Sequence, residues 1–151
     1  MNVIEATAGE IATAVARGRI SATEVCQAFL SRIEAFEPTI RAFSHLDPDD
    51  ALAQAARIDA QPEKGELADV PVGVKDIYDT AGMPTEFFSA IYAGNRPSRD
   101  AAVVARLRAA GAIVIGKTTT TEFAYMHTGP TRNPHDLSRT PGSSSAGSGA
   151  G

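Results

Sequence analysis

The chain has 151 residues, of which 43% are hydrophobic and 21% are charged, with a formal net charge of −4. This is enough apolar sequence for the core of one domain, and too little length for two domains of ordinary size. The negative charge excludes a broad basic surface for nucleic acid, and the low aromatic content of 6% argues against a base-stacking surface. The single cysteine, Cys26, excludes an internal disulfide and is typical of a reducing compartment.

No targeting segment is visible in the sequence. Glu5 and Glu10 stand where a signal peptide would have positive charge followed by an apolar run. Arg106 and Arg108 interrupt the most hydrophobic region, residues 101–115, so that no segment can span a bilayer. We therefore expect a cytoplasmic protein that binds neither nucleic acid nor membrane.

The first part of the chain, residues 1–69, has the signals of a helical section. Capping boxes at Thr7–Glu10 and Ser21–Glu24 predict two helix starts, because the hydroxyl and the carboxylate satisfy each other's backbone amides. Pro38 is expected to lie beyond the end of the second helix. The apolar positions of the second helix follow helical spacing: Val25, Phe29, Leu30, Ile33 and Phe36.

Cys26 is expected beside this apolar face as a buried structural thiol. A third helix is predicted from Asp47-Pro48 towards Ala60, with Asp49 and Asp50 as first-turn charges, and a polar loop over 61–69 follows.

Residues 70–151 have a different character. Short β-branched runs at 70–74 and 112–115 predict two buried strands, and a helix between them is capped by Ser98 or Asp100 and stopped by Gly111. One face of this helix is expected to hold Ala102, Val103, Leu107 and Ala110. Strand, helix and strand in this order predict a right-handed βαβ unit with parallel pairing. The fold class is therefore α/β, with N-terminal helices followed by the first strands of a mixed, mainly parallel sheet.

Gly111–Thr118 matches the phosphate-loop pattern G-x-x-x-x-G-K-[ST]. That loop needs a strand before its first glycine, whereas here a helix precedes it and Ala-Ile-Val-Ile favours an extended strand. Nucleotide binding is therefore kept only as an unfavoured alternative, and Lys117 is interpreted as an ordinary lysine at a strand end.

The serine-rich segment Gly142–Ala146 resembles a nucleophile elbow without its last glycine, but no clear strand precedes it. His127 and His135 are more simply solvated loop residues than catalytic bases. No group of potential ligands has metal-site spacing, so we expect neither a metal nor a cofactor. Residues 141–151 are almost wholly Gly, Ser and Ala, a composition that by itself is typical of a flexible linker.

Four blocks in order along the chain resemble the amidase signature family: residues 72–76, 116–124, 131–134 and 141–148. The most specific blocks are Gly-Val-Lys-Asp in the first and Pro-Gly-x-Ser-Ser in the last. The resemblance implies that residues 70–151 are the first part of that family's core, in one incomplete domain overall. It also implies hydrolysis of carboxylic amides through an acyl-enzyme, with release of ammonia or an amine, by a Ser–cis-Ser–Lys triad.

Within that triad, Lys75 matches the catalytic lysine and Ser144 matches the bridging cis-serine, with Ser145 as the adjacent alternative. Asp76 and Glu122 match supporting positions of the family. A lysine of ordinary pKa is neutral in about one molecule in 2,500 at pH 7, a cost of roughly 4.6 kcal/mol. Burial at a strand end would lower that cost, because it penalises the charged form.

Two departures from the family pattern affect the expected activity. The first is Ser143, which stands where relatives usually carry glycine. The second concerns the family's nucleophile, a serine in a Gly-Gly-Ser block well beyond the cis-serine, whereas this sequence ends seven residues after Ser144. We therefore expect the isolated chain to be inactive. The alternative function is a truncated, non-catalytic binding or scaffold subunit. The expected protein partners are a second copy of the chain, in a homo-oligomer, or a complementing C-terminal portion. The substrate is expected to be a small-molecule amide, and the sequence does not separate a free amidase from one chain of an amidotransferase.

Overall fold

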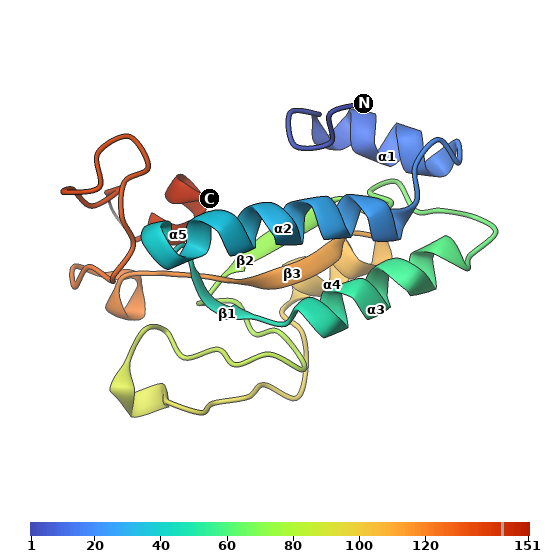
Figure 1. Cartoon of the computed structure of the whole chain (residues 1–151). Helices are drawn as coiled ribbons and strands as arrows, with labels where there is room; N and C mark the ends of the chain where they lie inside the picture. The colour runs from blue at the N-terminus through green and yellow to red at the C-terminus, as the bar shows by residue number, and fades with distance from the viewer. Residues whose placement is uncertain (143) are drawn as a thin grey trace. The chain divides into compact units, whose positions relative to one another are not determined.

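The computed structural model describes residues 1–142 and 144–151, which form helices, two short 3₁₀ helices and three strands (Figure 1). In chain order these elements are α1 (Ala8–Ala16), α2 (Ala22–Ile40), β1 (Phe43–Leu46), α3 (Pro48–Asp59), β2 (Pro71–Lys75), η1 (Ala90–Tyr92), α4 (Ala102–Ala109), β3 (Ile113–Thr118), η2 (Glu122–Ala124) and α5 (Ala146–Ala150). None of the helices in the described part of the chain combines the length and hydropathy that a bilayer span requires.

The three strands form one sheet in the order β1-β3-β2. The Ile113 amide donates to the Val70 carbonyl near the start of the pair, and the Asp76 amide donates to the Thr118 carbonyl near its end. Strands β2 and β3 therefore run in the same direction, which confirms the predicted parallel pair. Strand β1 pairs with β3 in the antiparallel sense and makes the sheet mixed. Its sequence, Phe-Ser-His-Leu, has no β-branched residue, and it was not predicted.

Local capping determines where the first two helices begin. At α1 the Thr7 hydroxyl accepts from the Glu10 amide while the Glu10 carboxylate accepts from the Thr7 amide, which confirms the predicted capping box. The same reciprocal bonds join Ser21 and Glu24 at the start of α2.

The predicted end of α2 is wrong, because Pro38 lies inside the helix. Proline removes one backbone donor from the helical ladder, but α2 continues for two more residues. Its end is fixed by the Glu37 carboxylate, which accepts from the amides of Ala42 and Phe43 at 3.0 and 2.9 Å. Arg41 turns the chain there with a positive φ of 56°.

The predicted third helix and its following loop are confirmed. Asp47 caps α3 by accepting from the Asp50 amide, and Pro48 occupies the first helical position. Gly111 ends the α4 segment with a φ of +90°, as expected of a glycine stop. The predicted apolar face of α4 is wrong, however. Val104 is the fully buried residue of α4, whereas the exposed fraction of Val103 is 45%.

The chain forms two compact units. The first comprises residues 1–33, 47–72 and 105–115, and its interior is mainly aliphatic. The second comprises residues 34–46, 73–104 and 116–151. Its interior is unusually polar, with buried Asp76, Thr80, Thr85, Ser89, Lys117, Thr118, Thr119, Thr120, Thr121 and Thr131. The predicted boundary at residue 69 stays a prediction.

Cys26 and Asp69 are both fully buried in the first unit. Burial raises the pKa of the Cys26 thiol to about 11, which agrees with the predicted structural thiol. Neither Asp69 carboxyl oxygen has a hydrogen-bond partner among the described residues. Its backbone has a φ of 64°, a conformation that favours glycine.

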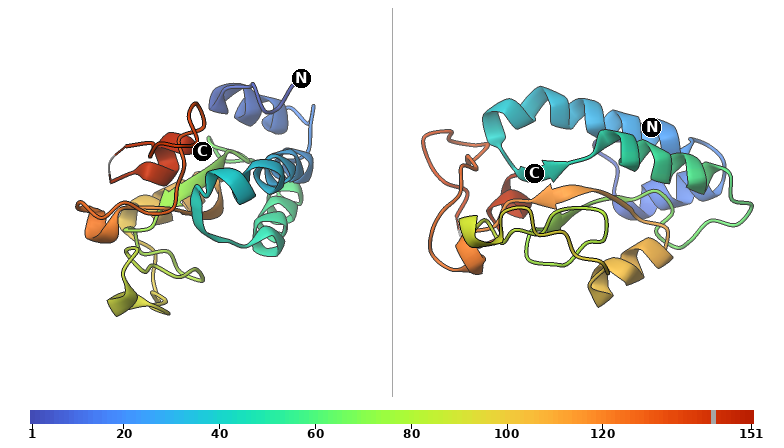
Figure 2. Two further views of the ribbon diagram at one scale, coloured as in Figure 1. Left: turned by 60° about the vertical axis from the view of Figure 1, so that its left-hand side comes forward. Right: turned by 90° about the horizontal axis from the view of Figure 1, so that it is seen from below.

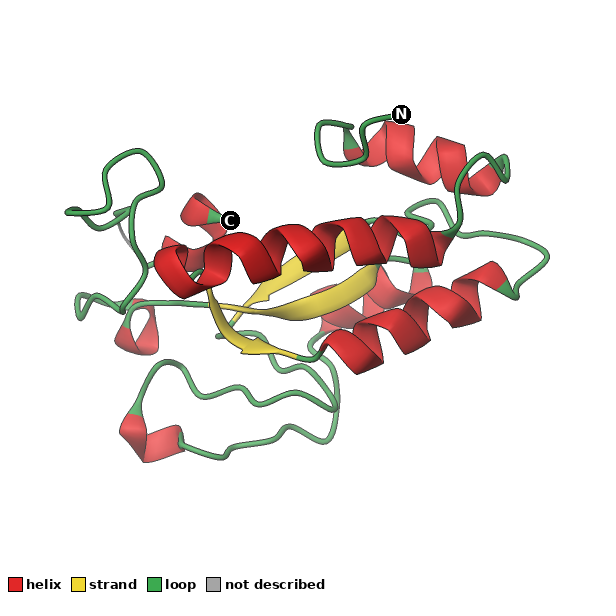
Figure 3. Cartoon of the chain, in the orientation of Figure 1, coloured by secondary structure: helices red, strands yellow, loops and turns green. Residues whose placement is uncertain are grey.

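A long connection joins β2 to α4 in the second unit, and η1 is its one short helical turn (Figure 3). Figure 2 shows this connection in two further views, as the green and yellow segment. Polar contacts with the buried side chains of Asp76 and Lys117 hold this connection at Tyr78, Pro84, Thr85 and Glu86.

Candidate active site

Lys75 and Ser144, which lie far apart in the sequence, meet in the second unit. Lys75 is the last residue of β2, and its Nζ donates to the Ser144 Oγ at 3.0 Å. Partial burial lowers the pKa of the Lys75 ammonium, because desolvation penalises its charge. The two residues predicted as catalytic therefore lie within direct proton-transfer distance of each other.

The backbone carbonyl of Ser144 is held by the segment that follows β3. The Thr120 hydroxyl donates to this carbonyl at 2.9 Å, and the Thr121 amide approaches it at 3.4 Å. No cis peptide bond occurs among residues 1–142 and 144–151. Ser143 and the bond that joins it to Ser144 lie outside the described residues, and so does the expected effect of Ser143 on the loop.

The glycine-rich end of the chain is packed rather than linker-like over residues 144–151. The Gly147 amide donates to the Thr119 carbonyl at 3.1 Å, and Gly147 is buried. A Cβ at this position would lie 2.2 Å from the Ala42 carbonyl oxygen, so only glycine fits. Ser148 adds a hydroxyl contact with Thr118 at 3.1 Å. Close backbone approach therefore accounts for the glycine at position 147.

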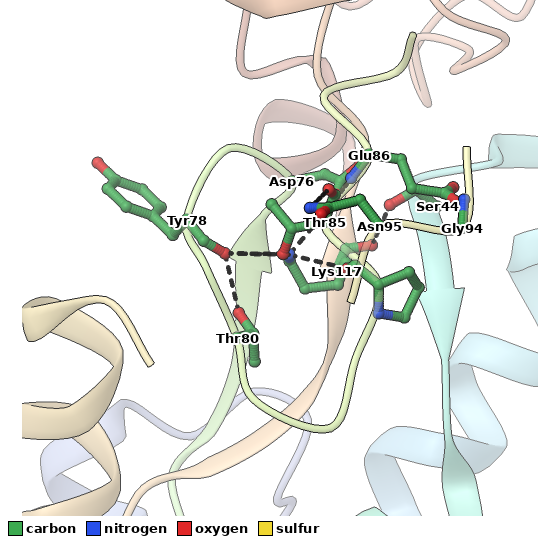
Figure 4. A network of polar contacts seen from close by, with 10 residues as sticks. Ser44, Asp76, Tyr78, Thr80, Thr85, Glu86, Gly94, Asn95 and Lys117 are labelled. Carbon is green, nitrogen blue, oxygen red and sulfur yellow. Dashed lines mark hydrogen bonds and ion pairs between the residues drawn. The ribbon is translucent and has the colours of Figure 1, made fainter. Parts of the chain in front are cut away.

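Lys117 is not the ordinary strand-end lysine that the sequence suggested. Its side chain is fully buried and its Nζ lies 3.1 Å from the Asp76 carboxylate (Figure 4). The same Nζ donates to the carbonyls of Tyr78 and Pro84 at 3.0 and 3.1 Å and to the Thr85 hydroxyl at 2.6 Å. Burial lowers the pKa of Lys117, and the Asp76 carboxylate opposes that effect. The ammonium thus joins β3 to the beginning of the long connection.

The two predicted supporting residues each fix a backbone segment or a neighbouring side chain. Asp76 accepts from the Glu86 amide at 3.3 Å as well as pairing with Lys117. Glu122 accepts from the Ser89 hydroxyl at 2.8 Å. Asp76 follows Lys75 directly, so its contacts also restrain the backbone that bears the lysine.

The phosphate-loop alternative is not supported by the geometry of its residues. Ile113–Thr118 is a strand in which every residue is buried, and the Lys117 ammonium is already occupied. An extended strand cannot curl its amides around a phosphate. His127 is exposed over 88% of its side chain, as predicted for a loop histidine. Within the described residues, no cluster of His, Cys, Asp and Glu could hold a metal ion.

Sequence reasoning missed the roles of Lys117 and of the threonine run, residues 118–121. A run of four threonines at a strand end is typical of an exposed strand surface. These threonines are instead buried, and their hydroxyls bind other parts of the second unit. The predicted strand ended at Ile115, whereas β3 continues to Thr118 and includes Lys117. A lysine inside a buried strand requires a carboxylate partner, so a longer strand prediction would have given the signal.

A sequence model of the family described as Amidase matches residues 24–151. The chain belongs to the amidase family. It is 49% identical to a glutamyl-tRNA(Gln) amidotransferase subunit of Salinispora arenicola over 95% of this chain and 31% of that protein. The chain spans about a third of the length of the curated relatives it matches.

Solved amidase structures share the fold described above. The peptide amidase of Stenotrophomonas maltophilia superposes with a TM-score of 0.89 at 35% identity, covering 97% of this chain and 33% of that one. A fatty acid amide hydrolase superposes with a TM-score of 0.90 at 26% identity, covering 98% of this chain and 28% of that one. The predicted α/β class is confirmed, as a partial amidase fold.

Proposed function

We propose that this chain supplies the lysine and the bridging serine of an amidase active site, which acts on carboxylic amides through an acyl-enzyme. The observation that supports this proposal is the 3.0 Å hydrogen bond between Lys75 Nζ and Ser144 Oγ inside the segment that matches the family. Two such groups pass a proton directly only at hydrogen-bond distance, and this separation meets that requirement.

In the proposed reaction the neutral Lys75 amine takes the proton of the Ser144 hydroxyl, and Ser144 takes the proton of a nucleophilic hydroxyl. That hydroxyl oxygen forms a bond to the amide carbon, and the C–N bond breaks as the proton returns through Ser144 to the leaving nitrogen. A water molecule then loses a proton through Ser144 to Lys75 and its oxygen bonds to the acyl carbon. The C–O bond to the nucleophile breaks, and the proton returns through Ser144 to the nucleophile oxygen as the carboxylic acid leaves. The nucleophile is expected from a Gly-Gly-Ser segment of the complete enzyme, and no serine of this chain is assigned to that role.

The partial burial of Lys75 suits it to this role. A general base works best when its pKa lies near the operating pH, and desolvation moves the pKa of Lys75 in that direction. The Ser144 hydroxyl is a weak base by itself, and it can accept a proton only as it passes its own proton to Lys75. Lys75 is therefore the base of the pair, and Ser144 relays the proton between Lys75 and the nucleophile.

The substrate is proposed to be a small-molecule amide, and the protein is proposed to be cytoplasmic. A partner chain is part of the proposal as well. One relative is named as one of the subunits of an amidotransferase, and a solved relative at 41% identity is described as part of a vestigial protein complex.

A chimera tests the proposal, with this chain replacing the corresponding third of the S. maltophilia peptide amidase. Lys75→Ala and Ser144→Ala are each expected to abolish amide turnover, while Lys64→Ala serves as a control that keeps it. The chain alone is expected to show no turnover on a panel of simple amides and no labelling by a serine-directed phosphonate. An active chimera that tolerates Lys75→Ala would contradict the proposed role.

A further inference from the structure

The contact between Lys75 and Ser144 depends on where the backbone of Ser144 lies, and a buried hydroxyl donates to that backbone. Thr120 is fully buried, and its Oγ1 donates to the Ser144 carbonyl at 2.9 Å. The second contact to this carbonyl, from the Thr121 amide at 3.4 Å, is longer than a well-formed N–H···O bond. The Thr120 hydroxyl is therefore the stronger of the two contacts.

We infer that Thr120 is a positioning residue for Ser144, which it holds at hydrogen-bond distance from Lys75. The inference rests on the proposed function, in which Lys75 and Ser144 exchange a proton. Thr120 donates to the backbone carbonyl of Ser144 and not to the Ser144 hydroxyl that exchanges the proton.

The strand pair explains why Thr120 can act in this way. Strands β2 and β3 run in the same direction, so their carboxyl ends lie at the same edge of the sheet. Lys75 is the last residue of β2, and Thr120 lies two residues beyond the end of β3. The hydrogen bond from the Asp76 amide to the Thr118 carbonyl at 3.0 Å fixes the two ends relative to each other. Ser144 is thus attached to one strand end through Thr120 and to the other through Lys75.

The other hydroxyls of the threonine run have different partners. Thr119 pairs with Thr131, and Thr118 with Ser148. Thr121 donates to the Tyr125 carbonyl at 2.9 Å. Loss of the Thr120 hydroxyl is therefore expected to affect Ser144 specifically.

The test measures the acylation rate of Lys75 by trace acetic anhydride, read by mass spectrometry and normalised to Lys64. Ser144→Ala removes the acceptor that restrains the Lys75 ammonium and is expected to raise this rate about 5-fold. Thr120→Val, which keeps the shape but not the hydroxyl, is expected to give the same rise. Thr120→Ser, which keeps the hydroxyl, is expected to give the wild-type rate.

A double variant separates positioning from a merely structural role. With Ser144→Ala present, Thr120→Val is expected to cause no further rise, since the two changes break the same contact. Thr80→Val is the matched control, because the Thr80 hydroxyl is equally buried and also donates to a carbonyl, that of Tyr78 at 3.0 Å. It is expected to leave Lys75 at the wild-type rate.

Two results would overturn the inference: a wild-type rate in Thr120→Val while Ser144→Ala raises it, or a double variant whose effects add. A wild-type rate in Ser144→Ala would instead refute the Lys75–Ser144 pair itself, and with it the proposed function. Circular dichroism checks that each variant is folded. If Thr120→Val does not fold, Thr120→Ala takes its place, with the same outcomes deciding the inference.

Discussion

Asp69 is predicted to destabilise the folded chain increasingly as the pH rises. Its carboxyl group is fully buried and lacks a hydrogen-bond partner among the described residues. Burial raises the pKa of Asp69 from 3.8 to about 8, and the nearby Asp59 carboxylate adds to the effect. The folded chain therefore binds a proton that the unfolded chain has released, at every pH between these two values.

The sign and size of the effect follow from this difference. For an acid whose folded pKa is raised, stability is highest below the unfolded pKa and falls until the pH passes the folded pKa. A difference of about 4 pKa units corresponds to at most ~6 kcal/mol. Relaxation and water entry reduce such penalties, so we expect a loss of roughly 2–4 kcal/mol in unfolding free energy between pH 5 and pH 8.

Urea unfolding at several pH values measures this loss in wild type, Asp69→Ala and Asp69→Gly. Both variants remove the carboxyl group and are expected to lack the wild-type decline. Asp69→Gly also relieves the positive φ of 64° and is expected to be about 1 kcal/mol more stable than Asp69→Ala. Parallel pH profiles for wild type and Asp69→Ala would show that the buried carboxyl group is not the cause.

Two further predictions concern the second unit. Lys117→Met leaves the buried Asp76 carboxylate without its cation and is expected to cost about 3–5 kcal/mol of unfolding free energy. Adding Asp76→Leu is expected to recover much of that loss. Urea unfolding measures both variants, and equal losses in the single and double variants would count against the ion pair. Gly147→Ala forces a Cβ against the Ala42 carbonyl and is expected to cost about 1–3 kcal/mol, whereas Gly149→Ala, whose Cβ would have 4.0 Å of space, is the neutral control in thermal melts.

Features encoded by neighbouring residues could be predicted from the sequence. The capping boxes at Thr7 and Ser21, the proline at the start of α3 and the glycine stop at Gly111 each act within a few residues. The parallel pair β2 and β3 followed from β-branched runs around a helix. These signals sufficed for the α/β class.

Features that depend on distant partners could not be predicted. Strand β1 is defined by its pairing with β3, and the segment after α2 is held by the Glu37 carboxylate, which accepts from the amides of Ala42 and Phe43. The burial of Lys117 could not be predicted, because its partner Asp76 lies 41 positions earlier in the chain and the pairing is visible only in the structure. At the site, Lys75 and Ser144 came from a family resemblance, whereas the hydroxyl of Thr120 has meaning only once the Ser144 carbonyl lies beside it.

The proposed chemistry depends above all on the direct contact between Lys75 and Ser144, which ¹⁵N NMR titration of the lysine side chains can examine. Lys75 is identified by the loss of its signal in Lys75→Arg. We predict a pKa for Lys75 below the ordinary lysine value, and a pKa that shifts again in Ser144→Ala, because the ammonium loses its acceptor. A Lys75 that titrates at the ordinary value and does not respond to Ser144→Ala would contradict the proposed pair.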